Sequence, residues 1–176
     1  MIQVAYQYCH YCGAKYPEAD HRLLPKHISC AACGRILYLN PKPTVTAWFQ
    51  KGQKILLVQR SQEPSKGAWG TVGGFMEYGE TPLEALVREA KEELGVNIKP
   101  GPYLGTKNDF YDNQQGELYN TLGLVYSAKL VSENFKLAEE LSDAQWFGAK
   151  DLPQDIGFPS TRWLIENWRD QGAPFA

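Results

Sequence analysis

The chain has 176 residues and a mass of 19.9 kDa, which suits one compact domain with a small accessory module rather than two full domains. Apolar residues make up 43% and charged residues 22%, and the formal net charge is -2, values that disfavour a disordered chain or a nucleic-acid coat protein. The first residues lack the pattern of a signal peptide, and no apolar run approaches the roughly 18 residues of a membrane span. We therefore expect a folded, cytoplasmic protein with no membrane partner.

All four cysteines lie in the first fifth of the chain, as Cys9-His-Tyr-Cys12 and Cys30-Ala-Ala-Cys33. Seventeen residues separate the two pairs, a spacing typical of a zinc site. A glycine follows each pair and lets the backbone turn, so that amide N–H groups can point at the thiolates. Four thiolates form a closed tetrahedral site, so we predict a structural zinc ion. Two disulfides are the alternative, which an intracellular chain disfavours.

A stiff connector is predicted at Asn40-Pro41-Lys42-Pro43, because each proline fixes its own φ and keeps the preceding residue extended. We place a domain boundary there, with a zinc-binding module over residues 1–40 and a second domain over 41–176. Apolar, β-branched runs over 44–50 and 54–60 predict a hairpin, and further strands are predicted over 103–110, 118–131 and 145–147.

The clearest helix is predicted over 81–94, and a second helix over 161–170. Thr81 and Glu84 form a capping-box pattern, Pro82 occupies the first helical position, and Gly95 follows the end. The apolar residues at helical spacing are expected to face a core, and they are Leu83, Leu86, Val87, Ala90 and Leu94. Several strands with two helices imply an α/β or α+β domain.

Three carboxylates fall beside the apolar face of this helix. Glu89, Glu92 and Glu93 share an arc of ~100°, where they repel one another unless a cation or solvent relieves the charge. Oxygen ligands of this kind suit Mg²⁺ or Mn²⁺, which commonly serve phosphate chemistry. The alternative is a solvated acidic face in which Arg88 pairs with Glu84 and Glu92. In either interpretation this part of the helix is expected to be exposed.

The stretch GFMEYGETPLEALVREAKEELGV, read from Gly74, resembles the Nudix box. The positions that match are Gly74, Glu80, Arg88, Glu89, Glu92, Glu93, Gly95 and Val96, and Ala90 is small where a bulkier aliphatic residue is usual. With the four cysteines in front, the whole chain is similar to zinc-ribbon Nudix hydrolases. The resemblance implies an α/β fold, a Nudix α/β/α sandwich with a small N-terminal zinc ribbon.

The resemblance also implies hydrolysis of the pyrophosphate bond in a nucleoside diphosphate linked to another group. Glu92 and Glu93 would be the main ligands of Mg²⁺ or Mn²⁺, helped by Glu89 and the carbonyl of Gly73. Arg88 would orient the carboxylates by salt bridges, and Glu80 would assist from the loop. A further glutamate, Glu140 or the adjacent Glu139, would come from a late loop. Glu89 and Glu140 both remain candidates for the general base.

The resemblance also implies a nucleotide substrate, and we expect a small-molecule partner rather than a nucleic acid. The NADH-pyrophosphatase branch carries a Ser-Gln-Pro-Trp-Pro-Phe-Pro tract after the box, which the segment 97–120 lacks. We therefore expect ADP-ribose or FAD before NADH. Phe110, Tyr111 and Tyr119 could stack an adenine ring, and ordinary strand packing is their alternative.

Other functions stay open at this stage. NADH or NAD hydrolysis and the decapping of dinucleotide-capped RNA need the same bond cleavage. A zinc-ribbon adaptor with a ligand-sensing Nudix domain would be a non-enzyme, and a homodimer is compatible with all of these interpretations.

Overall fold

The computed structural model describes residues 3–4, 7–16, 27–112 and 117–171. The chain divides into two units: Met1–Lys42 with Phe110–Thr121, and Pro43–Asp109 with Leu122–Ala176. No helix in these described ranges has both the length and the apolar character needed to cross a membrane.

The larger unit is built around a mixed sheet. Its strands are β4 (Lys42–Lys51), β5 (Lys54–Arg60), β6 (Trp69–Gly70), β7 (Val72–Phe75), β8 (Ile98–Asp112), β9 (Glu117–Leu130) and β10 (Leu141–Gly148). Strands β9, β4, β5 and β10 follow one another, while β8 pairs with β9, β7 with β4, and β6 with β5. The predicted hairpin is confirmed, since Gln50 pairs with Ile55 and Lys51 with Lys54.

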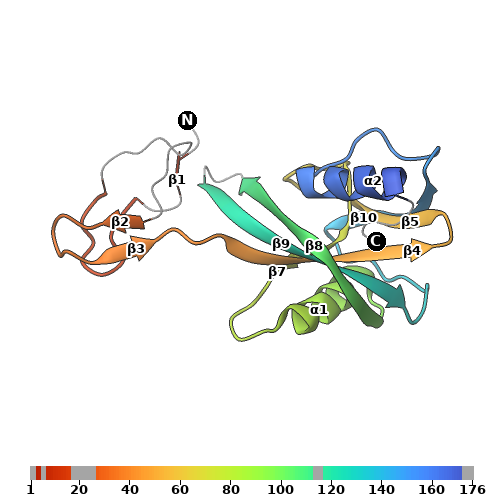
Figure 1. Cartoon of the computed structure of the whole chain (residues 1–176), viewed down its shortest axis with the longest axis horizontal. Helices are drawn as coiled ribbons and strands as arrows, with labels where there is room; N and C mark the ends of the chain where they lie inside the picture. Colours follow the sequence, from red (N-terminus) through yellow and green to blue (C-terminus); the bar gives the residue numbers. More distant parts are fainter. Residues whose placement is uncertain (1–2, 5–6, 17–26, 113–116, 172–176) are drawn as a thin grey trace. The chain divides into compact units, whose positions relative to one another are not determined.

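Two helices cover opposite faces of this sheet, α1 (Pro82–Leu94) and α2 (Pro159–Gln171) (Figure 1). Strand β5 explains why both faces are apolar. Leu56 and Val58 belong to the core that α1 covers, whereas Ile55 and Leu57 belong to the core that packs against α2. A continuous apolar run is expected for a strand buried on both faces. The α/β/α sandwich is therefore confirmed.

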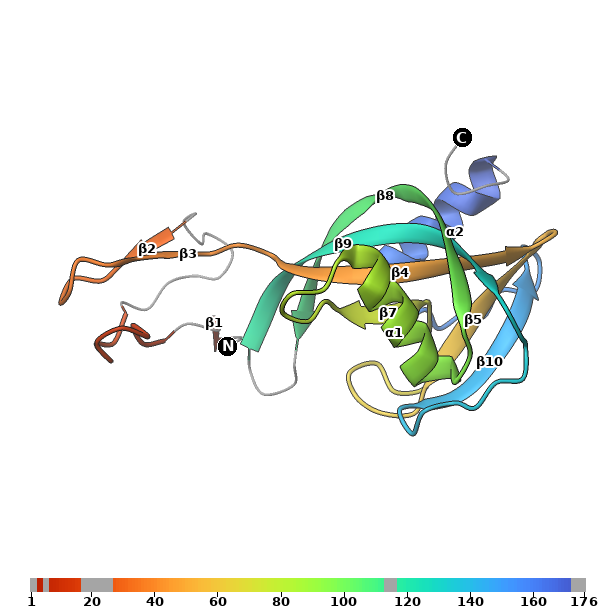
Figure 2. The same cartoon turned by 90° about the horizontal axis from the view of Figure 1, so that it is seen from below.

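Helix α1 begins and ends where its sequence signals predict. Thr81 is the N-cap, its hydroxyl accepts from the Glu84 N–H, and the Glu84 carboxylate accepts from the Thr81 N–H. Gly95 adopts a left-handed conformation at the C-cap, with φ of 69°, and its N–H donates to the Lys91 carbonyl. Figure 2 shows α1 lying across one face of the sheet beside β7, which it contacts.

The buried face of α1 differs in part from the expectation. Leu86, Ala90 and Leu94 are fully buried and Val87 packs against the same core, as predicted. Leu83 is 44% exposed, which contradicts the prediction, because it lies in the first turn at the end of the helix.

The smaller unit contains the cysteines. Two short strands, β2 (His27–Ser29) and β3 (Ile36–Tyr38), pair antiparallel, and β1 (Gln3–Val4) pairs with β9 in parallel. A small core gathers Cys9, Tyr16 and Cys30. Sequence patterns did not predict these strands, because each has only two or three residues.

Candidate functional site

The box glutamate Glu93 is buried against the strand that precedes the helix. Its side chain is only 7% exposed, and its Oε2 accepts a hydrogen bond of 3.0 Å from the Gly73 N–H. The expectation of an exposed carboxylate is wrong here, because α1 turns Glu93 toward the sheet. Gly73 has φ of 146°, and a Cβ there would come within 2.0 Å of the Val45 carbonyl oxygen. Position 73, whose N–H binds the Glu93 carboxylate, therefore requires glycine.

The electrostatics of this position indicate a site for a cation. The pKa of Glu93 is raised to about 8, mainly by burial and also by the carboxylates of Glu89 and Glu140, while the Gly73 N–H and the charge of Arg60 act in the opposite direction. Burial also raises the pKa of Glu89, again with a contribution from Glu140. These carboxylates, which come from two distant segments, are thus close enough to repel one another. A divalent cation would relieve that repulsion, so the donor set fits such an ion.

Arg88 organises the carboxylates around it. Its Nε donates to Glu80 at 2.7 Å, and its Nη1 donates to both Glu89 and Glu92 at 2.9 Å. Its Nη2 donates to Glu80 at 3.0 Å and to the Phe75 carbonyl at 2.9 Å. All three guanidinium nitrogens therefore act as donors, and the side chain links the loop after β7 to the helix.

The loop carboxylate of Glu80 is held in its charged form. The Arg88 guanidinium, helped by the Glu77 N–H, lowers the pKa of Glu80 to about 2. The alternative pairing of Arg88 with Glu84 is not observed, because Glu84 forms the capping box with Thr81. The pairing of Arg88 with Glu92 is observed.

Main-chain hydrogen bonds hold the segment that carries Glu140 beside the end of β5. The Ser61 N–H donates to the Glu140 carbonyl at 2.8 Å, and the Ser61 hydroxyl donates to the Glu139 carbonyl. The next residue, Leu141, pairs with Arg60 at the start of β10. Glu140, rather than Glu139, is the late glutamate whose charge acts on Glu89 and Glu93.

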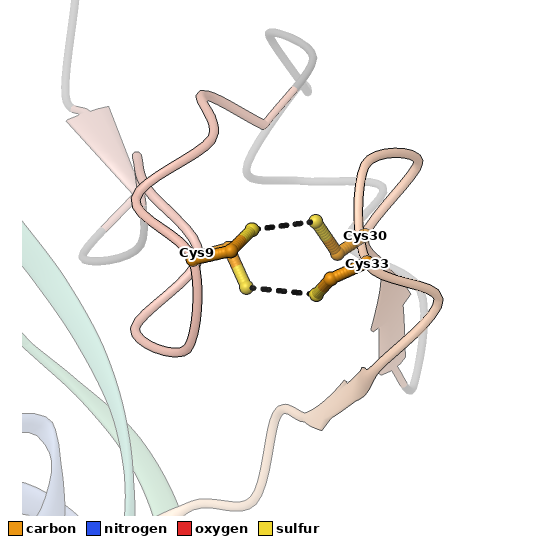
Figure 3. Close-up of side chains that lie close together, drawn as sticks. Cys9, Cys30 and Cys33 are labelled. Atoms are coloured by element: carbon orange, nitrogen blue, oxygen red, sulfur yellow. Dashed lines mark hydrogen bonds between the residues drawn. The ribbon is translucent and has the colours of Figure 1, made fainter.

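The cysteines form the tightest set of possible metal ligands. The Sγ atoms of Cys9, Cys12, Cys30 and Cys33 all lie within 4.8 Å of one another. Figure 3 shows Cys9 facing Cys30 and Cys33 across the space between two loops. Cys9 Sγ lies 3.7 Å from Cys33 Sγ, and Cys12 Sγ lies 3.6 Å from Cys30 Sγ. All four are free thiols, so the disulfide alternative is not observed. Among the described residues, no other group of three or more possible ligands is as compact, and this includes the box carboxylates.

The two cysteine loops have the same local geometry. The Cys9 N–H donates to the Ala14 carbonyl and the Gly13 N–H donates to the Cys9 carbonyl, and the loop at Cys30 repeats both bonds. The Tyr16 hydroxyl, together with backbone N–H groups, lowers the pKa of Cys9 to about 6. The Cys33 N–H is the main group that lowers the pKa of Cys30. The amides therefore point at the sulfurs, as the glycine after each pair predicts.

The predicted base-stacking residues belong to the smaller unit, whereas the box belongs to the larger one. Phe110 is 60% exposed on β8, and Tyr111 and Tyr119 are half-buried. The Lys42 Nζ lies 3.4 Å from the centroid of the Tyr119 ring, so a cation covers one face of that ring.

One residue near the carboxylates was missed by sequence reasoning. Arg60 ends β5, and its charge acts on Glu93. No spacing signal could have found it, because the register between strands brings it to the site.

The family model of the NUDIX domain matches residues 40–167. The chain belongs to the Nudix family. The chain is 34% identical over 118 residues to an ADP-ribose pyrophosphatase from Methanocaldococcus jannaschii, an alignment that covers 67% of this chain and 68% of the relative. It is 31% identical over 148 residues to the NAD-capped RNA hydrolase NudC from Pseudomonas aeruginosa, covering 84% of this chain and 49% of the relative.

Among solved structures, a NUDIX hydrolase from Nitrosomonas europaea shares 26% identity with a TM-score of 0.69, and the match covers 97% of each chain. The chain spans about half the length of the NudC relatives that it matches. The fold of this Nudix protein is therefore shared along almost its whole length with a solved member of the family.

Proposed function

We propose that this Nudix hydrolase cleaves the pyrophosphate bond of a nucleoside diphosphate linked to another group, with ADP-ribose or FAD preferred over NADH. The observation that carries the proposal is the group of mutually repelling carboxylates at Glu89, Glu93 and Glu140, one of them buried. The name of the M. jannaschii relative supports ADP-ribose as the first substrate to test. The expected products are AMP and a phosphorylated partner.

The metal ligands in this proposal are Glu89, Glu92, Glu93 and Glu140 with the carbonyl of Gly73. These groups would hold Mg²⁺ or Mn²⁺, which when bound would neutralise charge on the phosphate oxygens and lower the pKa of water. Arg88 orients Glu89 and Glu92 through its Nη1, and Glu80 holds Arg88 in turn. Glu89 or Glu140 accepts a proton as the general base. Phe110, Tyr111 and Tyr119 stack the adenine ring.

A second candidate function is the hydrolysis of NAD(H) or of NAD-capped RNA. The similarity to NudC, which covers 84% of this chain, favours testing it. It needs the same carboxylates and differs only in the group attached to the nucleotide.

The four cysteines bind a structural zinc ion in this proposal, in a domain that spans residues 1–40 and precedes the Nudix domain at 41–176. Four compact free thiols support the ion. A site with four protein ligands has no open position, so zinc takes no part in the hydrolysis.

The deciding experiment measures the cleavage of ADP-ribose, FAD, NADH and NAD-capped RNA side by side, in Mg²⁺ and in EDTA. The products of each reaction are identified. We expect cleavage of ADP-ribose or FAD with the highest kcat/KM and loss of cleavage in EDTA. Glu93→Gln should lower kcat by about 10²-fold or more, the scale of losing a key electrostatic group. Glu166→Gln, which removes an exposed carboxylate from α2, is the matched control and should leave the rate unchanged.

Two results would contradict the proposal. Full activity in EDTA, or in Glu93→Gln, would exclude the metal assignment. A preference for NADH or for capped RNA by a wide margin would select the second candidate function.

A further inference from the structure

The start of β9 belongs to the same unit as the cysteines. The segment Phe110–Thr121, which holds the end of β8 and the start of β9, groups with Met1–Lys42 rather than with the rest of these two strands. The predicted stacking residues Phe110, Tyr111 and Tyr119 all lie in this segment. Two paired strands alone are only marginally stable in water, so this end of the hairpin needs support from other elements.

The chain before the first cysteine loop supports β9 through main-chain pairing. Both residues of β1 pair in parallel with the start of β9, opposite Glu117 and Leu118. Val4, the second of them, lies five residues before Cys9. The position of the first cysteine loop therefore limits where β1 can lie.

The chain after the second cysteine loop supports β9 through a side chain. Cys33 is followed by β3 and then by Lys42, nine residues further on. The Lys42 Nζ lies 3.4 Å from the centroid of the Tyr119 ring, which is a cation–π contact. Each cysteine loop is thus continued by a segment that contacts the start of β9.

The core around the cysteines is too small to hold these segments in place by itself. Among the described residues its buried members are Cys9, Tyr16 and Cys30, and β2 and β3 have three residues each. Units of this size usually need a metal ion to fold. The four Sγ atoms, two from each loop, lie within 4.8 Å of one another, so an ion bound to all four would join the two loops.

We propose that the cysteine unit positions the start of β9 for substrate, so that loss of zinc weakens substrate binding and leaves the chemical step intact. The effect on substrate rests on the proposed function. With the two loops joined, the pairing of β1 and the contact of Lys42 act on β9 together and hold Tyr119 before substrate arrives. Less conformational entropy is then lost on binding. Gln3 and Val4 are positioning residues in this proposal, because they act on substrate through β9.

The first test measures amide hydrogen exchange by mass spectrometry in peptides that cover residues 117–121. It compares the zinc-loaded wild type with Cys30→Ser, and a peptide from β10 is the internal reference. We expect exchange in 117–121 to become about 10-fold faster in Cys30→Ser, the scale of losing a main-chain hydrogen bond, and exchange in β10 to stay unchanged. No substrate is present, so this result does not depend on the proposed function.

The second test breaks the pairing of β1 and leaves the cysteines intact. Gln3→Pro combined with Val4→Pro removes both backbone N–H groups of β1, and proline cannot donate to a neighbouring strand. The matched control, Gln3→Ala combined with Val4→Ala, changes the same side chains and keeps both N–H groups. The proline variant should keep about one zinc per chain by elemental analysis and show the faster exchange in 117–121. The alanine variant should match the wild type in both measurements.

Steady-state kinetics with ADP-ribose and Mg²⁺ connect the strand to substrate. In Cys30→Ser and in the proline variant, KM should rise about 10-fold, the scale of losing one stacked base, while kcat stays within about 2-fold of the wild type. The alanine variant should keep the wild-type KM.

Unchanged exchange in 117–121 on loss of zinc would overturn the proposal. Faster exchange in Cys30→Ser but not in the proline variant would also overturn it, since β1 would then have no part in holding β9. A wild-type KM in both variants would separate this segment from substrate binding and would have the same consequence. Failure of the proposed function has a different signature, because the wild-type protein would then cleave none of the pyrophosphate substrates while its exchange could still be measured.

Discussion

Replacing Glu93 by glutamine should remove a large pH dependence from the stability of the metal-free protein. Glu93 is 7% exposed, and its pKa rises from 4.5 to about 8 on folding, mainly because of burial. Between these two pH values the folded protein keeps a proton on Glu93 that the unfolded chain releases. The free energy of unfolding therefore falls as the pH rises. The stability that comes from keeping Glu93 protonated is fully present below about pH 4.5 and is lost as the pH reaches about 8.

The size of this effect follows from the shift. Each pKa unit corresponds to about 1.4 kcal/mol, so the whole shift corresponds to about 5 kcal/mol at most. That is a large share of the roughly 5–15 kcal/mol by which a domain is stable. Glutamine has nearly the same shape and carries no charge, and its amide oxygen can still accept the hydrogen bond from the Gly73 N–H. The variant should therefore fold and lack this pH dependence.

The assay is urea unfolding in EDTA at several values between pH 5 and 8, followed by the fluorescence of buried tryptophans such as Trp48 and Trp168. The wild type and Glu93→Gln should be nearly equal in stability at pH 5. At pH 8 the variant should be more stable by several kcal/mol, as expected for a carboxylate with a strongly raised pKa. The difference between the two curves reports the charge of Glu93 together with its repulsion of Glu89 and Glu140.

Addition of Mg²⁺ tests the metal assignment in the same experiment. The ion should stabilise the wild type at pH 8, because its positive charge compensates the negative charge of the buried Glu93 carboxylate. It should stabilise Glu93→Gln much less. A stability difference that stays constant from pH 5 to 8 would refute the reasoning on burial. Equal stabilisation of both proteins by Mg²⁺ would refute Glu93 as a ligand.

Three further predictions concern single residues. Cys30→Ser should abolish the binding of about one zinc per chain, measured by elemental analysis, while Nudix activity is partly kept, because a closed zinc site takes no part in catalysis. Gly74→Ala should keep the fold but lower kcat by about 10²-fold in steady-state kinetics, because its Cβ would lie 2.5 Å from Oε1 of Glu89 and displace that carboxylate. Phe110→Ala should raise the KM for ADP-ribose more than it lowers kcat, and a KM equal to that of the wild type would exclude Phe110 from the substrate site.

The parts of the molecule that depend on local spacing were predicted well. The limits of α1 follow from Thr81, Pro82 and Gly95, each of which acts on the backbone within one helical turn. The cysteine cluster follows from two short loops with the same pattern of residues. The hydrophobic runs of β4 and β5 likewise predict a hairpin, because strand propensity and a short turn are both local properties.

The parts that depend on packing were not predicted. The arc of Glu89, Glu92 and Glu93 follows from helical geometry, but the depth at which each lies depends on the sheet under α1. Glu93 is buried by that sheet, whereas the side chain of Glu92 is 57% exposed. A carboxylate at an inward position looks the same in sequence as one on a solvated face. On a solvated face, Glu93→Gln would change the free energy of unfolding only slightly, by relieving surface repulsion. Because Glu93 is buried, we expect a large, pH-dependent change in that free energy.

The reacting centre joins segments that are far apart in sequence, and this explains which residues reasoning from spacing could reach. Glu140 and Arg60 meet because Leu141 pairs with Arg60 and Asp143 with Gln59, a register that shifts between Leu141 and Asp143. A slip of one residue in such a ladder would turn a side chain to the other face of the sheet. No residue pattern near Glu140 encodes the irregularity before Asp143, although the resemblance to the family names Glu140 as a candidate. The box alone indicates the reaction class, but the positions of Arg60 and of the segment that carries Glu140 depend on how β10 pairs with β5.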